Sequence, residues 1–551
     1  MPSAAVLGPV VLPLATAAFI ALFGLAGMSL GRFVTAVGAW STVAALVGVW
    51  LPVRSSVELI LGPLGYGSAF DLRIDAVTFA FGLMVAVPTA LLLTLQPRTW
   101  RESTICLLAL GAAMATLEGG GVVLTAIAGG TTATLAVVLL ETEDARAARP
   151  SWALLLAGWL ALSWVGVILQ VIGGTAVYSA VPVATVSGPL FAVLAVAALL
   201  VSCLFPWRTW PAQIWGRPSL RAAGVVVATV FPLGFYLLVR AYELGDGRYP
   251  HPLFNIVLAA LGVLTAFAAA ARAQSAATRR EFLGEVVPFF GGFAMTAIAV
   301  GTALGLAAGI VILATAATLV AGLGLLPDRA GLASLVTIAA AVGLPPGIAF
   351  GSRVVAVEST FEAGDFVGLV GIAGMAAWAT LMVAGARAIG LPAGRGHPAT
   401  ETFPRVSLGI ALLTLVAGPA LAALQTGFAN PVAAEVMPSS AGSLGGGLAS
   451  VLTVSSVLPA LALFTPLLLL LAVLLYSVAG TSAIQTEARP ALLELPAASA
   501  FAQVREAVRG LAVPEQYRSI LNLRELELAA TGGKPVMWLV ALVALAVAVT
   551  R

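Results

Sequence analysis

Long blocks of apolar residues, separated by short polar connections, run along almost the whole chain. A helix needs about 20 mostly apolar residues to cross the roughly 30 Å hydrocarbon core of a bilayer. The blocks predict about sixteen such helices, and their approximate ranges are 4–28, 33–53, 76–96, 104–118, 121–140, 152–172, 189–206, 219–240, 253–272, 286–304, 306–326, 330–357, 366–387, 405–424, 458–480 and 535–550. The pattern therefore predicts an all-α polytopic membrane protein.

Two connections are long enough to form structure of their own. Residues 54–75 alternate between apolar and polar positions around glycine and proline, which predicts a small extracytoplasmic hairpin. Residues 481–534 are the most charged stretch, and part of it has apolar residues on one helical face: Phe501, Val504, Val508 and Leu511. This pattern predicts an amphipathic segment along the bundle or the membrane surface before the last helix. The alternative is a cytoplasmic segment packed loosely on the loops.

The basic residues predict the orientation of the chain. Of the 27 Lys and Arg residues, 21 lie in connections after odd-numbered predicted helices, and 6 lie after even-numbered helices or at the C-terminus. Cytoplasmic loops carry the excess of Lys and Arg. We therefore expect a multi-pass protein of a bacterial or archaeal plasma (inner) membrane, with both termini extracytoplasmic and the first helix retained.

Composition narrows the function. With 60% hydrophobic and 9% charged residues, the chain is not a soluble globular protein. Cys106 and Cys203 have no CxxC spacing or nearby histidine, so we expect no metal site and no cofactor. The glycine run at 119–121 follows a predicted helix and lacks a following lysine, which argues against nucleotide binding. A net charge of +3 gives no reason to expect nucleic acid as a partner, and the lipid bilayer is the expected environment.

Two predicted helices are interrupted by prolines. The seventh runs into Pro206 and Pro211, and the twelfth contains Pro345 and Pro346. Proline removes a helical donor, so the freed backbone groups must be met by protein or water. Broken helices in matched positions are typical of an ion pathway.

The two breaks occupy equivalent places in two blocks of five helices. Residues 104–240 and 253–388 each form such a block, and the fourth helix is the broken one in both. Because five is odd, the second block enters the membrane from the opposite side, which predicts an inverted repeat. The remaining predicted units are 1–103 with helices 1–3 and the hairpin, 405–480 with helices 14 and 15, the amphipathic or lateral segment 481–534, and the last helix in 535–551.

Four short motifs carry a resemblance to a known family. They are Asp71–Phe81, Phe205–Trp210, Gly234–Arg240 and Gly343–Phe350, in this order along the chain. The sequence resembles the antiporter-like subunits of respiratory complex I (the L, M and N subunits of NADH-quinone oxidoreductase) and their relatives in Mrp-type antiporters and membrane-bound hydrogenases. The resemblance covers roughly residues 55–425, and the amphipathic segment before a sixteenth helix looks most like the L subunit.

The resemblance implies a mid-membrane row of proton-carrying residues: Glu on helix 5, Lys on helices 7 and 8, and Lys or Glu on helix 12. This sequence departs from that row at every place. The corresponding residues are Gly130 (or its neighbour Gly129), Val201, Pro232 and Arg353, and the histidine of the helix 7 motif is Arg208. Arginine stays charged in proteins, so it cannot readily release a proton in a cycle.

The remaining candidates are acids. Glu118 precedes the glycine run, as a member of a proton path or as an interfacial turn residue. Glu285 lies near the start of the tenth helix, where the alternative is a helix-start carboxylate near Arg279 and Arg280. Glu358 follows Arg353 by five residues and would neutralise it only in part, because that spacing shares a helix face less well than four.

These observations predict a non-catalytic, antiporter-like membrane-arm subunit of a complex I-like or membrane-bound hydrogenase-like oxidoreductase. Its own proton path would be degenerate, and other membrane subunits would be its partners. The alternative is the membrane subunit of a two-component ion or inorganic-carbon transporter with the same fold. An independent secondary transporter is less favoured, because no pair of acids lies in the middle of the spans.

Overall fold

The computed structural model describes the chain from residue 2 to residue 438 with several gaps. The described ranges are 2–28, 32–65, 68–96, 98–143, 145–202, 204–205, 214–215, 222–326, 331–392 and 403–438. The predicted helices at 458–480 and 535–550 and the predicted amphipathic segment at 481–534 lie outside them.

The N-terminal part contains helices and one hairpin. Its elements are α1 (Pro2–Ala5), α2 (Gly8–Leu25), α3 (Arg32–Val53), β1 (Val57–Gly65), β2 (Ser68–Ile74) and α4 (Ala76–Leu95). β1 and β2 pair antiparallel, with Val57 opposite Ile74 and Gly65 opposite Ser68. The predicted hairpin is therefore confirmed, and it leads directly into α4.

The first predicted five-helix block is built from helices in the expected order. They are α5 (Trp100–Glu118), α6 (Val122–Glu143), α7 (Ala145–Gly173), the short 3₁₀ helix η1 (Val183–Thr185), α8 (Gly188–Val201) and α10 (Ala222–Leu244). Thr99 starts α5 with a capping box, in which its side chain accepts from the Glu102 amide and Glu102 accepts from the Thr99 amide. The prolines Pro206 and Pro211 lie outside the described residues.

The second predicted block has the same number of helical units. They are α11 (Leu253–Gln274), α12 (Arg279–Ala299), α13 (Ala303–Gly324), the pair α14 (Leu332–Val342) and α15 (Ile348–Ala363), and α16 (Asp365–Ile389). The break between α14 and α15 lies where Pro345 and Pro346 predicted it. Gly343 ends α14 in the left-handed conformation, with φ 77°, which glycine adopts at little cost. That the two blocks form an inverted repeat stays a prediction.

The prediction of a single helix at 405–424 is wrong, because this segment is broken and continues further. It consists of α17 (Pro404–Val416), η2 (Gly418–Ala420), α18 (Leu421–Leu424), the π-helical turn η3 (Gln425–Ala429) and α19 (Asn430–Val436). The two parts, Pro404–Val416 and Gly418–Val436, are bent by 63° at the break. The helical segment therefore continues to Val436, and the bend lies inside the range that was predicted as one straight helix.

Ten helices of the described residues are long and apolar enough to span a membrane, or eleven if the bent pair counts as one span. The predicted fourth span, α5, does not pass this test, and α8 and α14 are shorter apolar helices. The chain is thus an all-α polytopic membrane protein, and its described residues include one small hairpin. The predicted number of sixteen spans exceeds what the described residues contain.

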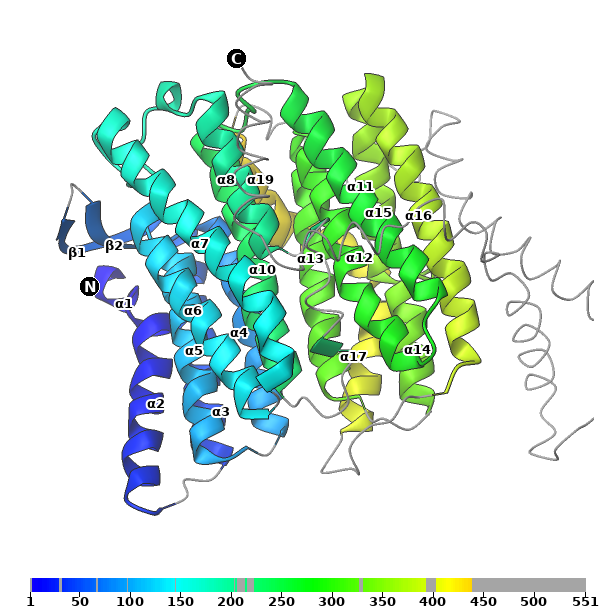
Figure 1. The fold of residues 1–551 in the computed structure, drawn as a ribbon, viewed down its shortest axis with the longest axis horizontal. Helices are drawn as coiled ribbons and strands as arrows, with labels where there is room; N and C mark the ends of the chain where they lie inside the picture. The colour runs from blue at the N-terminus through cyan, green and yellow to red at the C-terminus, as the bar shows by residue number, and fades with distance from the viewer. Residues whose placement is uncertain are drawn as a thin grey trace, which may run out of the picture.

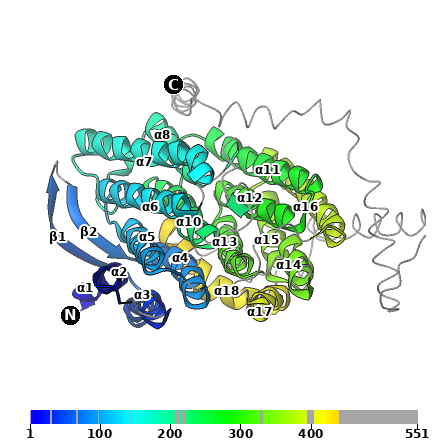
Figure 2. The same ribbon diagram turned by 60° about the horizontal axis from the view of Figure 1, so that its bottom comes forward.

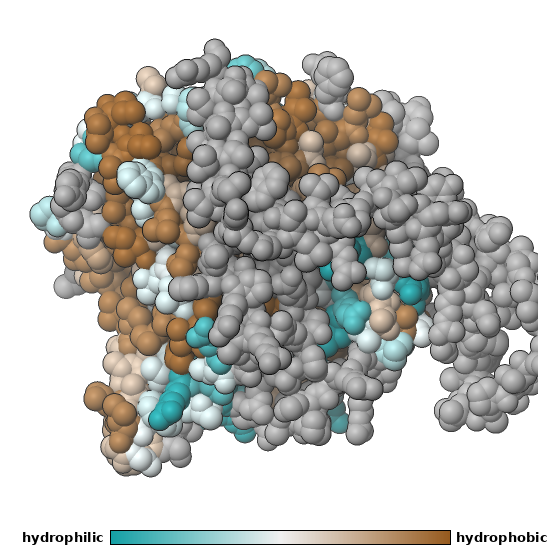
Figure 3. Space-filling model, in the orientation of Figure 1, coloured by the Kyte–Doolittle hydropathy of each residue, from teal (hydrophilic) through white to brown (hydrophobic). Residues whose placement is uncertain are grey.

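The helices run roughly side by side, with the hairpin projecting at one edge next to α1 (Figure 1). The turned view places α10 and α13 in the middle, between the α5–α8 side and the α11–α16 side (Figure 2). In α10 and α12 the most apolar 18-residue window is wholly buried by other helices, whereas in α2 only 22% of it is. The described part of the visible surface is mostly apolar, with polar residues gathered toward the lower rim (Figure 3).

Candidate functional site: buried charges in the helix bundle

Arg353 lies on α15 and reaches back to the end of α14. It is fully buried, and its guanidinium donates from Nη1 to the Val342 carbonyl at 2.6 Å and from Nη2 to the Ala341 carbonyl at 2.8 Å. The break at Gly343 leaves the last carbonyls of α14 without helical donors. Trp378 of α16 adds a third bond by donating from its indole N–H to the Val342 carbonyl at 2.8 Å. The break is therefore closed by side-chain donors.

Aromatic rings surround the same guanidinium. Its central carbon lies 4.9, 4.6 and 5.9 Å from the ring centroids of Phe289, Phe290 and Phe293, and 5.6 Å from that of Trp378. Ring faces attract a cation, and more strongly where water is excluded. No carboxylate among the described residues pairs with Arg353, so the expected partial neutralisation by Glu358 is absent from this part of the chain.

A second buried arginine, Arg240, lies at the end of α10 nearest the hairpin. Its Nη2 donates to Asp75 Oδ1 at 2.9 Å and to Thr78 Oγ1 at 3.0 Å, and its Nε donates to the Tyr236 hydroxyl at 3.1 Å. The Tyr236 and Thr78 hydroxyls both donate to the Leu117 carbonyl. Arg240 thus links α10 to the start of α4 and, through these hydroxyls, to α5.

Arg240 belongs to a charged network of two arginines and three acids: Arg73, Arg240, Asp75, Glu243 and Glu435. Arg73 on β2 pairs with Asp75 at 2.9 Å and with Glu435 of α19 at 2.8 Å, and both arginines contact Glu243 of α10. Glu435 also accepts from the Ala76 amide at 2.9 Å. Burial alone would raise the pKa of Asp75, but Arg240 and Arg73 hold it below its ordinary value.

Carboxylate oxygens of Asp75, Glu243 and Glu435 lie within 4.8 Å of one another, close enough in principle for a metal ion. In this structure Arg73 contacts all three acids, and Arg240 contacts Asp75 and Glu243. The guanidinium groups therefore take the place that a cation would need. The arrangement is an ion-pair network that joins four elements, and it offers no open ligand position.

Two further acids near the hairpin are fully buried. Glu118 ends α5, and neither of its carboxylate oxygens has a hydrogen-bond partner among the described residues. Asp71 lies on β2 beside Gly120, and its carbonyl accepts from the Gly120 amide at 2.8 Å. Burial, with Glu58 beside it, raises the pKa of Asp71 to about 7. Strand alternation alone does not reveal burial of both faces of β2, so the sequence pattern does not single out Asp71 as a buried acid.

The other two predicted acids, Glu285 and Glu358, lie in different helices, α12 and α15. Glu285 on α12 is buried, and its Oε1 lies 3.5 Å from Arg272 Nε of α11. Glu358 is half-buried on α15. The structure therefore does not bring Glu118, Glu285, Glu358 and Arg353 together into one site. Arg208 lies outside the described residues.

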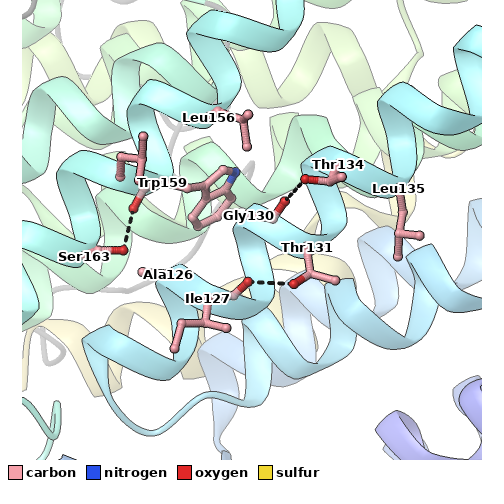
Figure 4. A pocket seen from close by; sticks show the side chains of 10 residues that line it. Ala126, Ile127, Gly130, Thr131, Thr134, Leu135, Leu156, Trp159 and Ser163 are labelled. Atoms are coloured by element: carbon pink, nitrogen blue, oxygen red, sulfur yellow. Dashed lines mark hydrogen bonds between the residues drawn. The ribbon is translucent and has the colours of Figure 1, made fainter.

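The positions where the resemblance implies Glu and Lys differ in their packing. A side-chain carbon added at Gly130, the position first expected, would meet only the Cβ of Trp159 on α7 at 3.8 Å (Figure 4), whereas one added at the neighbouring Gly129 would overlap the Trp159 ring. Val201 is the last residue of α8, is fully buried, and would meet a carbon added at Gly158. Pro232 is buried inside α10. Of the four expected positions, only that of Arg353 carries a charge.

Comparison with known proteins supports the fold. No family model matches the chain, and no curated protein matches it. Among solved structures, a chain of the Mrp complex from Dietzia sp. DQ12-45-1b is similar with a TM-score of 0.69 and 20% identity, over 95% of this chain and 62% of that one. A chain of respiratory complex I from Thermus thermophilus has a TM-score of 0.65 and 20% identity, over 81% of this chain and 100% of that one.

A chain of the membrane-bound sulfane sulfur reductase, an archaeal respiratory membrane complex, has a TM-score of 0.66 and 17% identity. It is matched over 80% of this chain and 100% of that one. At these identities the likeness concerns the fold. This chain shares the fold of membrane chains from Mrp, complex I and reductase complexes, which confirms the resemblance inferred from the motifs at the level of architecture. It spans 62% of the length of the Mrp chain.

Proposed function

We propose that the protein is an antiporter-like membrane-arm subunit of a complex I-like or membrane-bound hydrogenase-like assembly. The shared fold and the four ordered motifs support this class. The chain would carry no active site and would act through contacts with other membrane subunits. It would lie in a bacterial or archaeal plasma membrane, with the hairpin and both termini outside the cytoplasm, because most basic residues fall in the opposite connections.

We further propose that its own proton path is degenerate, so that the subunit is structural or weakly conducting. The observation that carries this proposal is the environment of the four expected positions. Gly130, its neighbour Gly129, Val201 and Pro232 have no titratable group, and the Trp159 ring fills the space that a side chain at Gly129 would need. Arg353 is fixed on two backbone carbonyls, and an arginine keeps its proton.

Reconstitution tests the degenerate path. Purified protein in liposomes is given a potassium diffusion potential with valinomycin, and a trapped pH dye reports proton entry. We expect no faster acidification than in protein-free liposomes. Saturable, potential-driven proton flux that depends on one of Glu118, Glu285 or Glu358 would overturn the proposal.

Purification from the native membrane in mild detergent tests the class. Co-purification with several membrane subunits and a redox module supports a membrane-arm subunit, whereas an isolated monomer counts heavily against it. The alternative from the sequence is the membrane half of a two-component ion or inorganic-carbon transporter. Co-purification with one large soluble metalloprotein, and without quinone- or hydrogen-linked subunits, would favour that alternative.

A further inference from the structure

The hairpin is attached to the bundle through the glycine run at 119–121, which we call the glycine turn. The hairpin lies at one edge of the bundle (Figure 1), and β2 meets the glycine turn with the edge that faces away from β1. Leu72 pairs there with Gly119 in an antiparallel bridge, and the Gly120 amide donates to the Asp71 carbonyl at 2.8 Å. The glycine turn therefore receives the free edge of β2.

Gly120 makes room for a buried carboxyl group. A side-chain carbon added there would overlap Oδ2 of Asp71. The Asp71 side chain is fully buried, and neither of its carboxyl oxygens has a hydrogen-bond donor among the described residues. Burying an ionised carboxylate without donors is so unfavourable that the group binds a proton instead. This position therefore favours the carboxylic acid form of Asp71.

Glu58 on β1 is the partner of that acid. Ile60 lies opposite Asp71 and Glu58 lies opposite Arg73, so the Glu58 and Asp71 side chains are on the same face of the hairpin. The two carboxyl groups are within hydrogen-bonding reach. Two carboxylates have no donor between them, so this contact is attractive only when one proton is shared. Glu58 is exposed, which lets that proton exchange with the solution on the hairpin side.

The other charged groups around Asp71 do not replace the proton. Arg73 favours the ionised form of Asp71, but its guanidinium is already paired with three acids: Asp75, Glu243 and Glu435. Of the helices that pack on β2, α4 begins after Asp75, α5 ends with the acid Glu118, and α6 has acids only at its far end. Burial and Glu58 outweigh Arg73, and they raise the pKa of Asp71 to about 7.

We propose that Glu58 and Asp71 form a proton-binding site that holds the hairpin on the glycine turn. With one proton shared, the Asp71 carboxyl stays under Gly120 and β2 keeps its contacts with the turn. When the proton leaves, two negative charges face each other and the buried carboxylate has no donor, so the hairpin loosens from the turn. The site thus responds to pH on the hairpin side of the membrane. It does not depend on the proposed function, because it needs only the hairpin and the turn.

Infrared difference spectroscopy of the full-length protein in detergent detects the proton directly. A protonated carboxyl has a carbonyl band distinct from the bands of carboxylates, and we expect part of this band to be lost between pH 5 and pH 8. Asp71→Asn should abolish that loss. Glu58→Gln, whose amide donates to the Asp71 carboxylate, should move it about one pH unit or more lower. Glu362→Gln, at an exposed acid of α15, is the control and should change nothing.

A spin label on the hairpin measures whether the proton holds it in place. The label is attached to Leu61→Cys, an exposed position of β1, and protein without this cysteine corrects for background. We expect the rotational mobility of the label to rise severalfold between pH 5 and pH 8, and to stay constant with Asp71→Asn. Gly120→Ala keeps both acids but displaces the Asp71 carboxyl, so its hairpin should be mobile already at pH 5. Gly48→Ala is the control, because an added carbon there meets nothing within 4 Å.

The two measurements separate the proton from its effect on the hairpin. Equal infrared titrations of the wild type and Asp71→Asn would show that this pair binds no proton. Loss of the infrared band with unchanged label mobility would show that the proton does not hold the hairpin. Spectral changes caused by calcium chloride at constant pH, in place of changes with pH, would identify a metal site. Each of these results overturns the proposal, whereas a protein that purifies without partner subunits refutes only the proposed function.

Discussion

Arg353 caps the C-terminal end of α14 through its side chain. A half-helix ends with unpaired carbonyls and a partial negative charge, and a cation near that end is favourable. Its guanidinium satisfies two carbonyls of α14, and four aromatic rings lie around it. A side chain held in this way stabilises the break between α14 and α15 and has no freedom to carry protons.

Replacing Arg353 should therefore affect folding more than conduction. Arg353→Leu removes the side-chain donor of the Ala341 carbonyl and leaves the Val342 carbonyl only the Trp378 indole. A buried acceptor left without a donor costs about 1–3 kcal/mol, so we expect a clearly lower midpoint of thermal unfolding in detergent and poorer assembly. Arg405→Leu, at an exposed position at the start of α17, is the control and should change little. Normal assembly of the Arg353→Leu protein together with a complete loss of proton pumping would contradict this account.

Asp71 gives a prediction about pH. Its pKa is about 7 in the folded protein, raised by burial and by Glu58, against 3.8 for an ordinary aspartate. Between these two values the folded state holds a proton that the unfolded chain has lost, so stability falls as pH rises from about 4 to about 7 and is then level. Hydrogen exchange of the hairpin amides and of the Gly120 amide at pH 5, 6, 7 and 8 measures this effect.

The contribution of Asp71 is isolated by comparison with a neutral variant. Asp71→Asn has a similar shape and does not titrate, so we expect its hairpin exchange, corrected for the intrinsic rate, to change less between pH 5 and 7 than that of the wild type. Glu58→Gln should reduce the slope in part, because it removes the neighbouring negative charge. An identical slope in wild type and Asp71→Asn would show that another group is responsible.

Two helix breaks lie against each other in the bundle. A carbon added at Gly418 would overlap the Pro346 carbonyl oxygen, and one added at Gly347 would lie 3.4 Å from the Thr414 carbonyl and 3.5 Å from the Leu415 carbonyl. The break between α14 and α15 thus contacts the break between α17 and η2 directly. Each interruption leaves backbone groups in the interior of the bundle, and close mutual packing limits their exposure to lipid.

This contact predicts that Gly418 tolerates no side chain. Gly418→Ala should lower stability by about 1–3 kcal/mol, as expected for overpacking, and the two breaks should move apart. Gly409→Ala on the preceding helix α17 is the control, because an added carbon there meets nothing within 4 Å. Equal thermal unfolding midpoints for the two variants would rule out tight packing of the breaks.

The elements differ in how well the sequence predicts them. Apolar length predicts the helices, alternation around glycine and proline predicts the hairpin, and Pro345 and Pro346 predict the break, since all three depend on local sequence. The bend at 417–418 depends on the other break that it contacts, so a hydropathy pattern over 405–424 does not reveal it. Likewise the spacing from Arg353 to Glu358 suggested an ion pair, whereas the arginine is held by carbonyls and rings that come from α12, α14 and α16.

One ion-pair network joins segments that are far apart in the chain. Arg73 and Asp75 at the start of α4 contact Arg240 and Glu243 at the end of α10, and Glu435 in α19. These elements come from the N-terminal part, the first block and the segment after the second block. Removing one member of such a buried network leaves an uncompensated charge and is costly. The network therefore fixes the hairpin end of the bundle.

The distribution of basic residues predicts the orientation of the whole bundle in the membrane. If basic connections face the cytoplasm, the hairpin is outside and the connection between α11 and α12 is inside. Single cysteines at Ser55 and Ser275, both exposed, mark the two sides. In intact cells a membrane-impermeant maleimide should label Ser55→Cys and spare Ser275→Cys, which should react only after permeabilisation. The protein without added cysteine corrects for Cys106 and Cys203. The reverse pattern would place the hairpin and its charged network on the cytoplasmic side.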